Sequence, residues 1–375
     1  MKPATYLRGA AVISLAALGC AVPASTAGAA EIRRPPALPD AGAGPATFAY
    51  LCVNPKDRDL LPSGPCDTWR VVTADGRIYS LPDALAWEKS KNPDELGEPG
   101  TFAISPDGQR VAYHRARDDR VVVRDLASGE TRTISYRVPR GSVGSPFTLR
   151  FVRDGNTLVI SSADLEPAAD VIAQVQDGTA RRVAKGWTLL DIDPETGRQT
   201  LYQPAGMAKR GVFRTVEGRR GTTAKIPVNA GKHLIWGAVA AHDGRAANLV
   251  PKDPPACGPD MTPVWLAVFT TETGKMRTVK PRLPADVYRA DVIDWLGPDE
   301  IVAAAARERP GKEPEEPVGS SVYAMNVSTG ASRLIAKLST TEQVYLDRLA
   351  VGGYTAAQGP VAAGKAAKPA KRGCE

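Results

Sequence analysis

Histidine and cysteine, the side chains that most often hold metal ions or act in catalysis, are scarce in this sequence. There are three histidines and five cysteines among 375 residues. The cysteines are widely scattered, with no C-x-x-C pair and no histidine close by, so their spacing does not indicate a zinc site. His114 and His233 lie in or next to predicted strands, and His242 lies in a predicted turn. These are typical places for structural or solvent-facing histidines.

Other functional signatures are also missing. No G-x-S-x-G nucleophile elbow occurs, and the serines of residues 141–145 (G-S-V-G-S) have the wrong spacing for one. The formal net charge is +7, but the basic residues are interspersed with acidic ones and form no run, which argues against nucleic-acid binding. A mild positive charge would still attract anionic polymers of a cell envelope. No polar tract or shift in composition divides the chain, so we expect one domain.

Residues 1–29 have the features of a secretory signal peptide. Two basic residues precede an apolar run, Gly9 to Leu18, that is too short to cross a bilayer, and Ala27-Gly28-Ala29 is an A-x-A cleavage site. We therefore expect a secreted or extracytoplasmic protein that is cleaved after Ala29. Alternatively, Ala17-Leu18-Gly19-Cys20 resembles a lipobox, which would anchor the mature chain to a membrane through a lipid on Cys20.

Removal of residues 1–29 leaves an even number of cysteines, which favours two disulfides in an oxidising compartment. The candidates are Cys52, Cys66, Cys257 and Cys374. Cys52 ends an apolar run and Cys66 opens the next, so a bridge between them would close the loop that joins two neighbouring strands. A bridge between Cys257 and Cys374 follows only by elimination, and it would require the C-terminal tail to reach the opposite face of the fold.

The most informative pattern is F-A-I-S-P-D-G-Q-R-V-A-Y at residues 102–113, in which two alternating apolar runs flank a tight turn. The turn motif is Ser105, Pro106, Asp107 and Gly108: proline presets φ, aspartate bonds to the local backbone, and glycine accepts the conformation at which the next strand departs. A second hairpin follows and completes four strands in the length of one propeller blade. Similar hairpin pairs recur along the chain. The pattern predicts an all-β fold, a single β-propeller of about six four-stranded blades.

We expect residues 48–350 to form the propeller, with an N-terminal lead-in at 30–47 and a flexible basic tail at 351–375. Only three strands are found before residue 82, and the apolar stretch 344–350 has no hairpin partner of its own. This last strand would complete the first blade as its innermost strand, a three-plus-one clasp of N- and C-terminal strands that closes the ring. The blade at 187–226 is the least clear, because the turn at 193–197 fits either of its two hairpins.

Residues 102–113, and more loosely 149–160, resemble the repeat of TolB-type and WD-like β-propellers, in which an S-P-D-G turn joins the two inner strands of a blade. The resemblance covers about residues 48–350 and implies the propeller fold. It implies little about function, because the family includes partner-binding scaffolds, periplasmic translocation components and the propeller lids of serine peptidases. Residues 30–47 are too few for the α/β domain that precedes the propeller of TolB, so the role of TolB in envelope translocation is not carried over.

Two functions of different classes are open. Long inserts at 54–65, 82–100, 136–146, 251–263 and 307–318 are all expected at one face, and loops raised on a rigid scaffold typically bind partners. This favours an exported non-catalytic scaffold, without a cofactor, that binds a protein, a glycan or a small ligand. The alternative is a metal-assisted hydrolase or lactonase whose channel carboxylates hold an ion such as calcium. The candidate carboxylates are Asp191, Asp291, Asp294 and Asp347.

Overall fold

The computed structural model describes residues 32–54, 63–88, 97–137, 147–162, 170–203, 211–227, 230, 239–251, 262–308, 317–338, 340, 342 and 344–355. The predicted signal peptide and lipobox, His233, Cys257 and Cys374 lie outside these ranges. Residues from Arg33 onward belong to one compact unit.

Six sheets, each of four antiparallel strands, form the ring of the fold. Each sheet is a blade, and its strands are given from the inner edge outward. Blade 1 contains β26 (Leu349–Val351), β1 (Ala46–Tyr50), β2 (Trp69–Thr73) and β3 (Ile78–Leu81); blade 2 contains β6 (Phe102–Ile104), β7 (Arg110–Arg115), β8 (Arg120–Asp125) and β9 (Thr131–Arg137); blade 3 contains β10 (Phe147–Phe151), β11 (Thr157–Ser162), β12 (Val171–Gln174) and β13 (Ala180–Arg182). Blade 4 contains β14 (Thr188–Ile192), β15 (Gln199–Gln203), β16 (Val212–Glu217) and β17 (Arg220–Lys225); blade 5 contains β18 (Ala240–His242), β19 (Arg245–Pro251), β20 (Pro263–Thr270) and β21 (Met276–Val279); blade 6 contains β22 (Val287–Trp295), β23 (Glu300–Glu308), β24 (Pro317–Asn326) and β25 (Ser332–Lys337).

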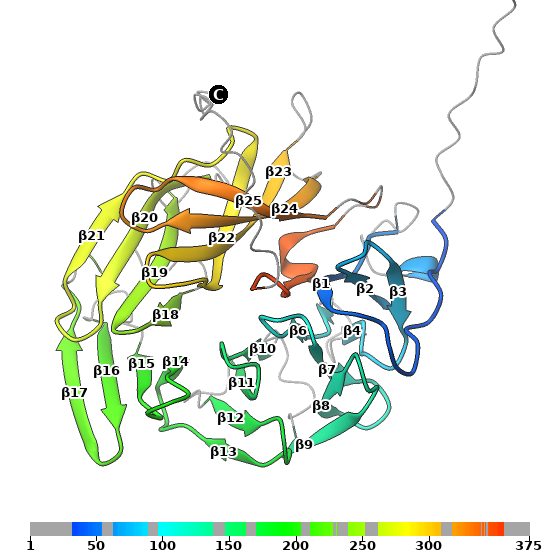
Figure 1. Ribbon diagram of the computed structural model, residues 1–375, viewed down its shortest axis with the longest axis horizontal. Coiled ribbons are helices and arrows are strands. Elements are labelled where there is room, and N and C mark those ends of the chain that lie inside the picture. The colour runs from blue at the N-terminus through cyan, green and yellow to red at the C-terminus, as the bar shows by residue number, and fades with distance from the viewer. Residues whose placement is uncertain are drawn as a thin grey trace, which may run out of the picture. The chain divides into compact units, whose positions relative to one another are not determined.

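The blades follow one another round a ring in chain order (Figure 1). The innermost strands of successive blades contact one another: β26 contacts β6, β6 contacts β10, and β18 contacts β22. Buried apolar side chains fill the space between neighbouring sheets. The ring of Trp69 in blade 1 lies 4.8 Å from that of Phe102 in blade 2, which lies 6.0 Å from the ring of Tyr113. The prediction of an all-β propeller with six four-stranded blades is confirmed.

The antiparallel order gives the ring two different ends. Turns within the first and second hairpins of each blade lie at one end, the turn end. Connections from second to third strands, and from one blade to the next, lie at the other, the loop end. All the long predicted inserts leave their strands at the loop end, although their central residues lie outside the described ranges. The turn at 193–197 joins β14 to β15, which places it in the inner hairpin of blade 4.

The Ser105–Gly108 turn joins β6 to β7 as predicted. Asp107 Oδ1 accepts hydrogen bonds from the Ser105 hydroxyl at 2.5 Å and from the Gln109 amide at 3.0 Å. Gly108 has a φ of 76°, a conformation that glycine adopts without steric cost. The motif therefore fixes the path from the inner strand to the second strand of blade 2.

Arginines connect the turns of successive blades, a feature that the sequence did not predict. Each stands at or next to the start of a second strand and reaches the inner turn of the following blade. Arg110 Nη1 donates to the carbonyl oxygen of Gly155 at 2.9 Å, Arg198 Nη2 donates to Asp243 Oδ1 at 3.1 Å, and Arg245 Nη1 donates to Asp299 Oδ1 at 3.4 Å. These bonds hold neighbouring blades together at the turn end.

The inner hairpin of blade 5 differs from its prediction. His242 is the last residue of β18 and pairs with Arg245, so it lies in the strand and not in the turn. The turn consists of Asp243 and Gly244, with φ of 44° and 72°, and two positive φ values are typical of the type I′ turn that suits the twist of a hairpin. The sequence pattern predicts that the strand begins at residue 235, but residues 235–238 lie outside the described ranges.

The last strand lies beside β1, but it is shorter and begins later than the predicted strand at 344–350. β26 pairs with β1 through Leu349 and Tyr50, Ala350 and Ala49, and Val351 and Phe48. The residues before it form a 3-10 helix, η3 (Leu346–Arg348). Side chains three residues apart eclipse one another in such a helix, and this brings Arg348 over the ring of Tyr345. That the pairing of β26 with β1 clasps the ring stays a prediction.

The lead-in covers the outer edge of blade 1. The amide of Leu38 donates to the carbonyl oxygen of Ser80 at 2.8 Å, and the amide of Ser80 donates to that of Pro36 at 2.8 Å. Further along, the amide of Ala43 donates to the carbonyl oxygen of Leu126 in blade 2 at 3.1 Å. The lead-in thus satisfies edge groups of β3 that would otherwise be open to pairing with another chain.

Candidate functional site

After β26 the chain continues into Gly352–Thr355, which we call the C-terminal segment, and this segment crosses to the turn of blade 2. Three of its amides donate hydrogen bonds of 3.1 Å to carbonyl oxygens: Gly352 to Thr47, Gly353 to Ser105, and Thr355 to Pro106. The hydroxyl of Thr355 also donates to Pro106, at 2.8 Å. The Ser105–Gly108 turn is therefore a docking site for the end of the chain. These contacts involve residues 352–355 of the predicted tail, while residues 356–375 lie outside the described ranges.

Glycine is required where this segment meets the turn. Gly353 has a φ of 62°, and a Cβ atom there would lie 2.5 Å from the carbonyl oxygen of Ala46. A Cβ atom on Gly352 would lie 2.3 Å from Cγ2 of Ile104. Both approaches are closer than any real Cβ contact, so the segment fits only because two glycines bring backbone against blade 1 and blade 2.

Tyr354 carries the segment to the axis of the ring. Its hydroxyl donates a buried hydrogen bond of 2.6 Å to Asp294 Oδ2 in blade 6. Arg150 and Arg153 of blade 3 are close enough to act electrostatically on both Tyr354 and Asp294. Blades 3 and 6 face each other across a six-bladed ring, so a side chain close to both lies near the axis. Tyr354 is 6% exposed, so its side chain is buried at the turn end.

Asp294 is the most deeply buried carboxylate of this region. Its Oδ1 accepts the amide of Trp295 at 2.8 Å and its Oδ2 accepts the hydroxyl of Tyr354. Burial raises its pKa above the ordinary value of 3.8, although these two hydrogen bonds oppose the shift. Burial and the neighbouring carboxylate likewise raise the pKa of Tyr354 well above 10.0, so its hydroxyl stays protonated and donates.

The raised pKa of Asp294 predicts a pH-dependent stability. The folded state holds this proton more tightly than the unfolded state, so the protonated carboxyl favours folding at low pH, and this contribution is lost as the pH rises through the raised pKa. Asp294→Asn does not titrate. We therefore expect the wild type to lose stability relative to Asp294→Asn as the pH rises above about 4. Urea unfolding of both proteins at pH 4 and pH 8 measures this, and a difference that is the same at both pH values contradicts it.

The other predicted channel carboxylates do not join Asp294. Asp191 is buried, with Oδ2 3.9 Å from Nδ1 of His242, and Asp291 pairs with Arg289 at 3.2 Å. Asp347 lies in η3, and its side chain is outside the description. Within the described ranges, no three histidine, cysteine or acidic side chains gather in a way that could hold a metal ion. His114 is buried at the loop end of blade 2, with Nε2 3.8 Å from Oδ1 of Asp119.

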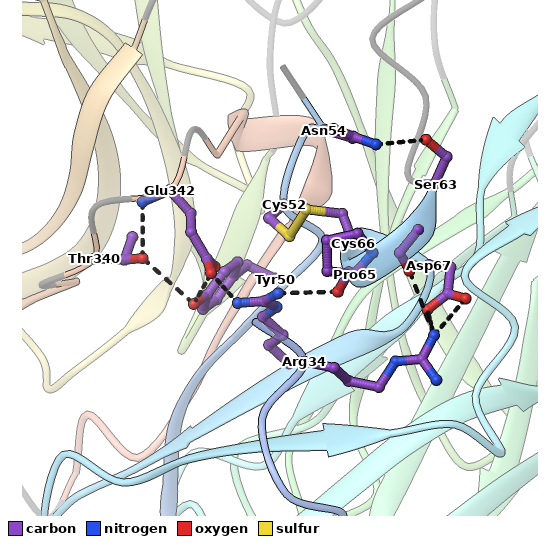
Figure 2. Close-up of a disulfide and its surroundings, with 12 residues drawn as sticks. Arg34, Tyr50, Cys52, Asn54, Ser63, Pro65, Cys66, Asp67, Thr340 and Glu342 are labelled. Carbon is purple, nitrogen blue, oxygen red and sulfur yellow. Dashed lines mark hydrogen bonds and ion pairs between the residues drawn. A yellow bond between two sulfur atoms is a disulfide. The ribbon is translucent and has the colours of Figure 1, made fainter. Parts of the chain in front are cut away.

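At the loop end, the predicted disulfide between Cys52 and Cys66 is present (Figure 2). It joins the chain after β1 to η1 (Gly64–Cys66), just before β2. Beyond it, Asn54 Nδ2 donates to Ser63 Oγ at 3.0 Å. On the outer side, Arg34 of the lead-in pairs with Asp67 at 2.5 Å. Because these contacts surround its base, the connection between β1 and β2 is fixed where it leaves the blade.

A buried polar cluster below the disulfide holds the chain that leads into η3. Arg70 of β2 is 2% exposed and forms an ion pair with Glu342. Its Nη2 donates to the carbonyl oxygen of Pro65 at 3.0 Å, and the hydroxyl of Tyr50 donates to Glu342 Oε2 at 2.9 Å. Burial raises the pKa of Tyr50 to about 12. Figure 2 shows Glu342 directed toward the hydroxyl of Tyr50.

Two aromatic rings enclose an arginine at the same end. The guanidinium carbon of Arg348 lies 5.1 Å from the ring centroid of Trp87 and 5.2 Å from that of Tyr345. Trp87 belongs to β4 (Trp87–Glu88), which pairs with β5 (Glu98–Pro99) in a two-stranded sheet within the predicted insert at 82–100. The sequence did not predict this sheet. The stack fixes the insert beside η3 at the start of the innermost strand of blade 1.

Several residues that shape the site were missed by reading the sequence. Tyr354 stands in a stretch that looks like the start of a tail, and its only local signal is the Gly352-Gly353 pair before it. Asp170 is buried and accepts the amide of Leu189 at 2.6 Å, which joins blade 3 to blade 4. Burial raises the pKa of this carboxyl. Nothing near Asp170 in the sequence marks it, because its partner lies in another sheet.

Within the described ranges, none of the helices has the length and the apolar character that a membrane crossing requires.

Comparison with known proteins gives a likeness in structure alone. No family model matches the chain, and no curated protein matches it in sequence. Similar solved structures include TolB from Acinetobacter baumannii, with a TM-score of 0.45 and 13% identity over 81% of this chain and 66% of that one. A putative TolB from Agrobacterium tumefaciens has a TM-score of 0.37 and 13% identity over 81% of this chain and 92% of that one. An oligogalacturonate lyase in complex with manganese has a TM-score of 0.36 and 11% identity over 64% of this chain and 65% of that one. TolB proteins, whose repeat the sequence resembles, are thus among the similar structures.

Proposed function

We propose that this chain is an exported, non-catalytic β-propeller that binds a partner at its loop end, outside the cytoplasm. The observation that carries the proposal is the position of Tyr354. At the turn end, the protein's own C-terminal segment bonds to blades 1, 2 and 6, and arginines there bond one blade to the next. The loop end instead carries the long connections, one of them fixed at its base by a disulfide, which is how a rigid scaffold typically presents a binding surface.

Export is supported by the disulfide and by the features of residues 1–29. Disulfides persist in oxidising compartments, and the bond between Cys52 and Cys66 joins segments of the fold itself. We expect the mature protein to begin at Ala30 when the full chain is expressed in a bacterium. N-terminal sequencing of the exported protein measures this. A mature chain that begins with a lipid-modified Cys20 would support the anchored alternative, and an uncleaved chain in the cytoplasm would contradict export.

Photo-cross-linking tests the binding proposal. Trp265, near the loop-end start of β20, is 40% exposed, unusually so for a large apolar side chain. Glu195 is exposed in the turn between β14 and β15 at the turn end. A photoreactive amino acid placed at Trp265 should form adducts with a partner in cells that export the protein, whereas the same group at Glu195 should not. Equal adducts at both sites, or adducts at Glu195 alone, would contradict the proposal.

A further inference from the structure

A small cavity lies where β9 of blade 2 packs against β12 and β13 of blade 3 (Figure 1). Its volume is about 170 Å³, and a cavity of about 150 Å³ already accommodates a ring of six carbon atoms. Its floor is apolar, because Val123 of β8 and Val175, which follows β12, are buried. Its rim carries two arginines and two carboxylates, all from blade 2: Arg110, Arg132, Asp125 and Glu130.

Blade 3 holds both arginines of the rim in place. Arg110 Nη1 donates to the carbonyl oxygen of Gly155 at 2.9 Å and to Asn156 Oδ1 at 3.1 Å. Arg132 Nη1 donates to the carbonyl oxygen of Gln176. A guanidinium has five N–H groups, so each arginine keeps further donors while its position is fixed before a ligand arrives.

Each of these arginines has a carboxylate beside it. Arg132 Nη2 lies 2.7 Å from Glu130 Oε1, whereas Arg110 Nε lies 3.9 Å from Asp125 Oδ2, which is too far for a hydrogen bond. The other oxygen of Asp125, Oδ1, accepts the amide and the hydroxyl of Ser128 at 2.8 and 2.9 Å. The bond from the amide holds the pKa of Asp125 below its ordinary value of 3.8. The carboxylate is therefore charged, and no donor of the described residues forms a hydrogen bond with its Oδ2.

A rim that carries both signs of charge selects a ligand that carries both. A simple anion that approaches the arginines is repelled by the two carboxylates, and a simple cation that approaches the carboxylates is repelled by the two arginines. A zwitterion avoids both penalties. Its carboxylate accepts charge-assisted hydrogen bonds from guanidinium N–H groups, and its ammonium donates to a carboxylate oxygen. An apolar part of the same molecule fits the floor.

We propose that this cavity binds a small zwitterion, an α-amino acid with a short aliphatic side chain. The ammonium donates to Asp125 Oδ2, the carboxylate accepts from Arg110 and Arg132, and the side chain packs on Val123 and Val175. The site goes beyond the proposed function, because it takes a small molecule and lies between two blades at the turn end. It does not depend on the partner of the loop end.

Binding of L-valine to the full chain, measured by calorimetry, tests the choice of ligand. Isovalerate has the same carbon skeleton without the ammonium, and isobutylamine has it without the carboxylate. We expect L-valine to bind and each analogue to bind at least about tenfold more weakly, since each lacks one set of charged hydrogen bonds. This comparison uses the wild type alone, so it does not depend on the folding of any variant.

Two substitutions test the position of the site. Asp125→Asn keeps an oxygen for the turn at Ser128 and removes the charge, and Arg132→Gln removes one guanidinium. We expect each to weaken the binding of L-valine at least about tenfold. The matched controls are Asp193→Asn, whose carboxylate accepts amides in the inner turn of blade 4, and Arg277→Gln, whose guanidinium reaches Ser328 in the outer turn of blade 6. Both controls should stay within about twofold of the wild type.

Three results would overturn the proposal. The first is that none of glycine, L-alanine and L-valine binds at concentrations up to about 10 mM, which is weaker than any useful affinity. The second is that isovalerate or isobutylamine binds as well as L-valine, which would make the cavity a site for one charge only. The third is an equal loss of affinity in the site variants and in the controls, which would place the ligand elsewhere on the protein.

Discussion

Deleting residues 352–375 should lower the free energy of unfolding by about 4 kcal/mol. The deletion removes the buried ring of Tyr354 and the hydrogen bonds of the C-terminal segment to Thr47, Ser105 and Pro106. It also leaves the buried carboxylate of Asp294 without its hydroxyl donor. The entropy regained by four residues offsets part of this loss. Urea unfolding of the truncated and full-length proteins gives the difference.

Deletion of residues 356–375 alone is the matched control. It keeps every described contact of the C-terminal segment, so the free energy of unfolding should change by less than about 1 kcal/mol. Tyr354→Phe isolates the hydroxyl and should cost about 1 to 2 kcal/mol, because Asp294 keeps its burial but loses one hydrogen bond. If both truncations are equally stable, the segment does not hold the blades together.

Replacing Cys52 and Cys66 by alanine should lower the free energy of unfolding by about 3 kcal/mol. The two cysteines are 14 residues apart in sequence, and the bridge stabilises the fold mainly by limiting the freedom of the unfolded chain between them. Both side chains are fully buried. Thermal or urea unfolding of the double variant under oxidising conditions measures the loss.

The wild type in reducing agent should approach the stability of the double variant. As a further control, Asn54→Ala should lower the free energy of unfolding of the oxidised protein by less than about 1 kcal/mol, because it removes only one neutral hydrogen bond at the base of the same loop. A double variant that is as stable as the wild type would show that the bridge does not stabilise the blade.

The sequence predicted those parts of the fold that local physics controls. The Ser105–Gly108 turn combines a proline, a short acceptor side chain and a glycine at the places where a tight turn needs them, and the flanking alternation defines the two strands. These features need no knowledge of distant residues, and they gave the blades. The disulfide followed in the same way, because Cys52 and Cys66 adjoin the ends of neighbouring strands.

The sequence did not predict the features that depend on contacts between distant blades. Tyr354 meets Asp294, and Thr355 meets Pro106, only after the ring has formed. The predicted strand at 344–350 was too early because the stacking of Arg348 on Trp87 and Tyr345 favours a turn there, and hydropathy carries no sign of that stack.

Amide hydrogen exchange of the C-terminal segment tests most directly the claim that this segment docks at the turn end and leaves the loop end for the partner. The amides of Gly352, Gly353 and Thr355 donate to carbonyl oxygens of blades 1 and 2. They should exchange as slowly as the amides of β26 and β6, because the hydrogen bonds of the segment and those of the two strands open only when the ring opens. Exchange at the rate of an unstructured peptide, in a protein whose strands are protected, would show that the turn end is open and would contradict the account.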